Sequence, residues 1–143
     1  NGNGTVKVIV VDVRKNSPSE DLLQSVRDNI AANAPIGATV TVVAPALKTV
    51  NISLKVTSGS GDVDAIKTAL TTYFKNNVFG SNYTTQKMTD TVTISYAQIG
   101  RIILDNSSTT GVNDYSNLMV NGGTDNIVCA ANNLPVIGTV TLT

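Results

Sequence analysis

The chain has 143 residues, enough for one domain or two small subdomains, and its 10 basic and 10 acidic residues leave it without net charge. Balanced charge without a basic stripe argues against nucleic-acid binding, and no apolar run reaches the roughly 18 residues of a membrane-spanning helix. Histidine is absent, which removes the commonest general base and metal ligand, and the single Cys129 excludes an intrachain disulfide.

The first third of the chain predicts a βαβ unit. Residues 5–13, TVKVIVVDV, are β-branched and almost continuously apolar, which is typical of a strand buried on both faces. Ser17, Pro18 and Glu20 have the spacing of a helix start, with Ser17 as the N-cap. Residues 38–45 predict a second strand, parallel to the first because a helix connects the two.

The rest of the chain predicts the order β-α-β-α-β-β-β. Residues 48–58 alternate between apolar and polar side chains, as in a strand with one buried face, and residues 62–77 form an amphipathic helical pattern. The remaining predicted elements are a loop at 79–90, a strand at 91–96, a helix at 97–106, a loop at 106–114, and strands at 115–120, 126–130 and 136–143.

These elements predict an α+β fold with two small subdomains, residues 1–46 and 47–143. The strand-helix-strand units also fit a ferredoxin-like layout. Asn121, Gly122 and Gly123 lie between two apolar stretches, and both residue types accept the positive φ of a tight turn. We therefore predict a β-hairpin over residues 115–131.

No residue is predicted to be catalytic, to bind a cofactor or to hold a metal. Asp62 and Asp64 suit the positive end of the helix that follows them, and no glutamate stands where a calcium loop would need one. Cys129 lies in an apolar strand, so we interpret it as a small buried hydrophobe. Asp114 and Asp125 are expected to pair with Arg101 or to cap a turn.

One candidate protein contact lies in the stretch DYSNLMV. In strict alternation, Tyr115, Asn117 and Met119 share one strand face, and Leu118 and Val120 belong to the other. We expect the second face to enter the core and the first to form an interface, because an exposed tyrosine beside amides suits a protein contact. Packing of Tyr115 against the predicted helix at Ile99 and Ile102 is the alternative.

Three stretches together resemble the baseplate J family of contractile phage tails: GNGTVKVIVVD, PIGATVTVVAPALKTVNISLKV, and VTISYAQIGRIIL with the later DYSNLMVNGGTDNIV and LPVIGTVTLT. The resemblance covers the whole chain and corresponds to the C-terminal portion of the family. It implies a structural protein of the baseplate wedge in a virion tail or phage-tail-like particle, made in the bacterial cytoplasm.

The implied partners are other wedge and hub-proximal proteins, with self-association left open and no cofactor, nucleic acid, membrane or small-molecule substrate. Because the chain starts without Met and soon enters a strand, we interpret it as part of a longer protein. The alternatives are a ferredoxin-like regulatory domain that binds a small molecule, and an enzyme with a Lys- or Cys-based site.

Overall fold

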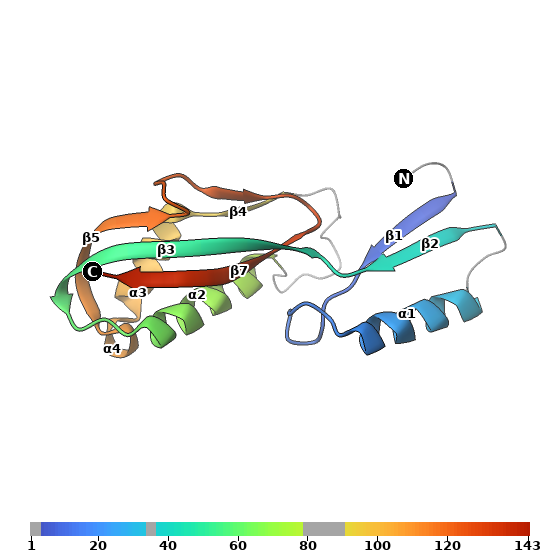
Figure 1. Cartoon of the computed structure of the whole chain (residues 1–143), viewed down its shortest axis with the longest axis horizontal. Helices are drawn as coiled ribbons and strands as arrows, with labels where there is room; N and C mark the ends of the chain where they lie inside the picture. Colours follow the sequence, from blue (N-terminus) through green and yellow to red (C-terminus); the bar gives the residue numbers. More distant parts are fainter. Residues whose placement is uncertain (1–3, 34–36, 79–90) are drawn as a thin grey trace. The chain divides into compact units, whose positions relative to one another are not determined.

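The structure is a computed structural model that describes residues 4–33, 37–78 and 91–143 (Figure 1). The chain divides into two compact units, Asn1–Ala46 and Leu47–Thr143. Both units contain helices and strands, and both parallel and antiparallel strand pairs occur. The predicted α+β class is therefore confirmed, while the loop predicted at 79–90 lies outside the described residues.

The first unit is the predicted βαβ arrangement. Strand β1 (Thr5–Ile9) pairs in parallel with β2 (Thr39–Val43), and helix α1 (Glu20–Asn33) connects them and packs on β2. Leu23 of α1 and Val42 of β2 are its buried large hydrophobic residues among those described.

The sequence prediction of a first strand buried on both faces is wrong. None of the five residues of β1 is buried, and Val6 is 51% exposed. The physical reason is that a strand face is buried only by a layer that packs on it, and in this two-stranded sheet α1 packs mainly on β2. An apolar composition alone cannot tell which elements cover a strand.

The start of α1 also differs from the prediction. The hydroxyl of Ser19, not that of Ser17, accepts a hydrogen bond from the backbone N–H of Leu22, at 3.3 Å. The Glu20 carboxylate forms an ion pair with Arg27, two turns further along the same face of the helix, and does not close a capping box. Ser17 and Ser19 are both suitable N-cap residues, so the sequence pattern alone did not identify Ser19 as the one that caps the helix.

A three-stranded sheet with the order β5-β3-β7 forms the centre of the second unit. The long strand β3 (Ala46–Gly59) lies between β5 (Val112–Val120), which runs antiparallel to it, and β7 (Asn133–Leu142). Val56 N donates to Thr143 O at 3.0 Å and Thr143 N donates to Leu54 O at 3.1 Å, which is the pattern of a parallel pair, and β3 and β7 point the same way in Figure 1.

Two helices pack on the sheet and against each other. Helix α2 (Val63–Val78) contacts β7, and helix α3 (Tyr96–Asp105) contacts β5. The alternate residues Val50, Ile52 and Leu54 of β3 are buried, which confirms the predicted period of two. They meet buried side chains of both helices in one core that also includes Ile66, Leu70, Phe74, Ile99 and Ile103.

Side-chain caps start α2 and α3. Oδ1 of Asp62 accepts hydrogen bonds from the backbone N–H groups of Asp64 and Ala65, at 2.9 and 3.0 Å. The Ser95 hydroxyl accepts one from Gln98 N at 3.3 Å and begins α3. Asp62 therefore has the structural role at a helix start that its position predicts.

The loop predicted at 106–114 instead contains a short helix and the start of a strand. Helix α4 (Ser107–Thr110) follows α3 directly, and Gly111 ends it with φ +68° before β5 begins at Val112. Thr110 is fully buried, and its hydroxyl donates to Ile103 O at 2.9 Å, which satisfies the polar group inside the core. This bond ties α4 to the end of α3. Within the turn itself, the Thr109 hydroxyl donates to Asn106 O at 3.0 Å.

The hairpin predicted over 115–131 is present only as its turn. Strand β5 pairs with β3, while β6 (Ile127–Cys129) pairs antiparallel with β4 (Val92–Ile94) in a separate two-stranded sheet. At the turn, Val120 N donates to Gly123 O at 2.8 Å and Gly123 N donates to Val120 O at 3.1 Å. The turn at residues 120–123 was therefore predicted correctly, but the strands on its two sides, β5 and β6, pair with β3 and β4 and not with each other.

The turn makes different demands on its two glycines. Asn121 and Gly122 have φ of +50° and +78°, as a type I′ turn requires, whereas Gly123 has no positive φ. We expect Gly122→Ala to lower the free energy of unfolding by about 1 kcal/mol, because alanine is strained at this φ. Gly123→Ala is the matched control and should change it by less; equal effects in urea unfolding would contradict this assignment.

Candidate functional site

The predicted contact residues lie on β5, where the regular alternation of the strand is broken. Ser53 of β3 lies opposite Met119 and Lys55 lies opposite Ser116, so Asn117 and Leu118 of β5 together face one residue of β3. Asn117 has φ +54°. These features define a β-bulge, in which β5 contains one extra residue relative to β3 and the facing of its side chains shifts by one.

The bulge separates the three predicted contact residues. Asn117 is exposed and Met119 is 44% exposed, as predicted, while Leu118 is buried in the core. Tyr115 is half-buried and packs against the core, so it shares a side with Leu118 despite the odd spacing. Asparagine inside an apolar strand is the sequence signal for this bulge, because it tolerates positive φ better than other non-glycine residues.

Tyr115 enters a space that Gly100 leaves open. A Cβ atom at Gly100 would overlap the Tyr115 hydroxyl oxygen and lie 3.2 Å from its Cζ. The glycine that interrupts α3 therefore lets β5 approach the helix closely. The alternative in which Tyr115 packs on this helix is the one that the structure shows, with Gly100 as the contact.

We use the name "open face" for the side of the β5-β3-β7 sheet opposite α2 and α3, and define it by Asn51, Ser53, Lys55, Met119, Thr139 and Thr141. The last two flank the buried Val140 on β7, and the first three alternate with the buried residues of β3. One charged residue and one large apolar residue belong to this set. A face with one charged side chain and one exposed methionine at its edge strand has a low desolvation cost, which suits contact with another protein.

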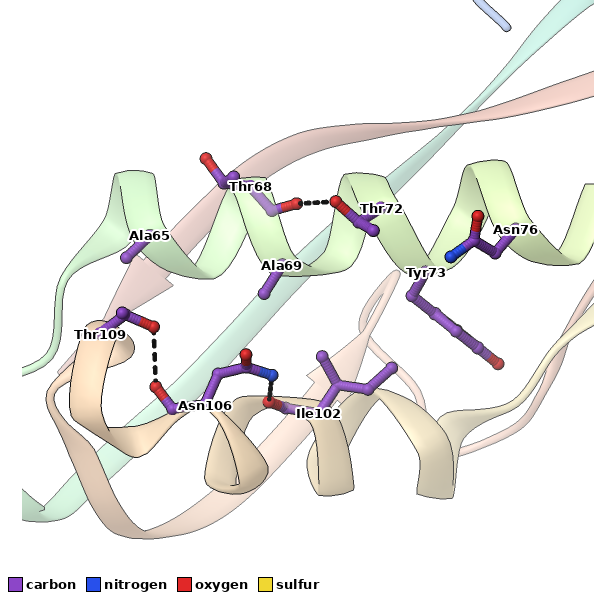
Figure 2. A pocket seen from close by; sticks show the side chains of 9 residues that line it. All are labelled: Ala65, Thr68, Ala69, Thr72, Tyr73, Asn76, Ile102, Asn106 and Thr109. Carbon is purple, nitrogen blue, oxygen red and sulfur yellow. Dashed lines mark hydrogen bonds between the residues drawn. The ribbon is translucent and has the colours of Figure 1, made fainter. Parts of the chain in front are cut away.

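A second surface feature is an open groove of about 570 Å³ between α2 and the α3–α4 segment (Figure 2). Its walls are lined by Ala65, Thr68, Ala69, Thr72, Tyr73, Asn76, Ile102, Asn106 and Thr109. None of these carries a charge. The Thr72 hydroxyl donates to Thr68 O at 3.1 Å and the Asn106 amide donates to Ile102 O at 2.8 Å, so these donors are used within their own helices.

The described residues contain no group of three or more potential metal ligands. Cys129 is fully buried, and burial raises the pKa of its thiol while Lys48 acts in the opposite direction. The thiol is therefore a weak nucleophile at neutral pH. Arg101 pairs with Asp105 at 2.7 Å, whereas Asp114 accepts from the backbone N–H of Tyr115. Of the two expectations for Asp114, pairing with Arg101 or capping a turn, the first is therefore not seen.

The sequence of this chain matches two domains of one protein family. Residues 50–143 match the baseplate J-like protein C-terminal domain, and residues 1–44 match the baseplate J-like central domain. This chain belongs to the baseplate J-like family. The resemblance proposed from the sequence is thus confirmed.

Two relatives from Bacillus subtilis (strain 168) align along nearly the whole baseplate J-like chain. It is 32% identical over 152 residues to the phage-like element PBSX protein XkdT, covering 98% of this chain and 40% of that protein. It is 30% identical over 154 residues to the uncharacterized protein YqbT, covering 99% of this chain and 40% of that protein. The chain therefore spans two fifths of the length of these relatives.

The residues that carried the resemblance have structural tasks in this baseplate J-like fold. Gly100 admits Tyr115 beside α3, and Gly122 supplies positive φ in the turn after β5. The described part of the chain has no helix long and apolar enough to cross a membrane.

Substitution of Gly100 tests the contact with Tyr115. We expect Gly100→Ala to lower the free energy of unfolding by about 1–3 kcal/mol, because the new methyl group displaces the tyrosine ring. This loss would outweigh the helix propensity that alanine gains, about 1 kcal/mol. Adding Tyr115→Phe should restore part of the stability, since it removes the overlapping oxygen; strictly additive effects in a double-mutant cycle would contradict the contact.

Tyr115 also predicts a pH dependence of stability. Burial, then the neighbouring Tyr96 and Asp114, raise the pKa of Tyr115 above its ordinary value of 10.0. The unfolded state then loses this proton first, so stability is fully present below pH 10.0 and falls as the pH rises through the folded-state pKa. Melting temperatures from pH 8 to about 11.5 should fall less steeply for Tyr115→Phe; parallel curves would contradict the shift.

Proposed function

We propose that this chain is part of a structural component of a contractile phage-tail baseplate, or of a related phage-tail-like particle. The observation that carries the proposal is its membership of the baseplate J-like family along both matched regions. The name of one relative, which places that protein in the phage-like element PBSX, supports the same context. The protein would be made in the bacterial cytoplasm and then enter the particle.

The proposed mode of action is contact with neighbouring wedge and hub-proximal proteins, without catalysis. The uncharged lining of the groove between α2 and α3 suits contact with another protein, because covering it desolvates no charged side chain.

We further propose that the open face forms one of these contacts, with Met119 on its edge strand β5, opposite Ser53 of the central strand, and the exposed Asn117 next to it in sequence. Met119 is a flexible apolar side chain that adapts to a partner surface. Tyr115, which the sequence placed in the same interface, supports it from behind by fixing β5 against α3. A partner that covers this face buries few charges, so its desolvation cost is low.

The test uses particles purified from the induced source strain, with the full-length protein as wild type or variant. Mass spectrometry should find peptides of this chain at a level comparable to other baseplate proteins. Met119→Asp should lower incorporation at least fivefold, because it places a carboxylate in the contact. Val128→Asp is the matched control, since Val128 is also exposed, at 61%, but lies on β6 outside the open face.

Absence of the wild-type protein from intact particles would overturn the structural role. Normal incorporation of Met119→Asp, with the wild-type protein present, would overturn only the assignment of the open face.

A further inference from the structure

The loop between β1 and α1 contains a tightly hydrogen-bonded segment, residues 12–16. Asp12 N donates to Asn16 O at 3.0 Å, and Lys15 N donates to Asp12 O at 2.9 Å. Oδ1 of Asp12 accepts from the backbone N–H groups of Arg14 and Asn16, at 2.8 and 2.7 Å, and Oδ2 accepts from the Asn16 amide at 3.1 Å. These bonds fix the backbone at the tip of the loop.

Two residues in this segment are poor choices for the turn that they form. Val13 occupies the first central position and is 98% exposed, although turns favour small polar residues, glycine or proline there. Lys15 has φ +60°, where glycine or asparagine is preferred. Local residue choices that conflict with local structure are expected at functional positions. Turn chemistry therefore does not account for Val13.

The loop tip also carries an available positive charge. Arg14 is exposed and makes no ion pair among the described residues. The Asp12 carboxylate next to it already accepts three hydrogen bonds within the segment. Val13 and Arg14 are consecutive residues, so a binding partner would contact an apolar isopropyl group and a guanidinium group that are adjacent in the sequence. The backbone that carries them is already ordered by the hydrogen bonds of the segment.

We propose that residues 12–16 form a docking loop for a neighbouring protein of the particle. That neighbour presents an apolar pocket, which receives Val13, bordered by carboxylates that pair with Arg14. A preorganised loop loses little conformational entropy on binding, which favours such a contact. The inference rests on the proposed assembly role and adds the chemistry of one partner surface to it.

The experiment replaces the full-length protein in the producing strain by variants and measures their incorporation into purified particles. Val13→Asp should reduce incorporation at least tenfold, because it puts a carboxylate into an apolar, acid-bordered pocket. Arg14→Glu should reduce it at least fivefold, and Val13→Ile should keep it near the wild-type level. Lys7→Glu is the control for charge reversal, because Lys7 is an exposed cation on β1 of the same unit.

Melting temperatures of the isolated full-length variants separate docking from folding. We expect Val13→Asp to melt like the wild type, because the side chain is exposed. A clearly lower melting temperature would show that another part of the same protein covers Val13, and would overturn the inference. Equal incorporation of all variants would overturn it too, while incorporation of the wild-type protein in the same experiment would leave the assembly role standing.

Discussion

The packing of β5 against α3 depends on the absence of a side chain at Gly100. Because the Tyr115 hydroxyl occupies the place of a Cβ atom there, strand and helix approach more closely than two ordinary side chains would allow. The bulge at Asn117 follows from the same contact, since one extra residue lets both Tyr115 and Leu118 face the helices. Without the bulge, strict alternation would send one of these two to the open face, and the Met119 side chain would change sides with the register.

Asn51 and Asn121 hold the other end of β5 to the sheet. The backbone N–H of Asn51 donates to the Asn121 side-chain oxygen at 2.8 Å, and Asn121 N donates to Asn51 O at 2.8 Å. The Asn51 side chain in turn accepts from Thr139 N of β7 at 2.9 Å. The two amides thus continue the hydrogen bonding of β3 to both neighbours beyond the point where β5 turns away, so the turn at Gly122 is part of the sheet rather than a free loop.

Local patterns in the sequence were enough to predict most helices and strands, but not which strands pair with each other. The alternation in β3 and the apolar stripe of α2 each reflect one buried face, which neighbours along the chain reveal. The pairing of β5 with β3 and of β6 with β4 joins residues far apart, and the turn at Gly122 fits a hairpin equally well. Likewise, exposure of Met119 followed from strict alternation, but the half-burial of Tyr115 required the bulge and the missing Cβ at Gly100.

The two sides of the β5-β3-β7 sheet suit different kinds of contact. The side facing α2 and α3 is filled by branched aliphatic residues, whose shapes must match closely and whose truncation costs about 2–5 kcal/mol. The open face carries mainly serine, threonine and asparagine, which have few rotatable bonds and no charge. Covering such residues sacrifices less side-chain entropy than covering lysine or glutamate, each of which loses up to about 2 kcal/mol. A face with sparse charges and short exposed side chains therefore loses little desolvation energy and little side-chain entropy when another surface covers it, and Met119 on the edge strand β5 would add one adaptable apolar side chain to such a contact.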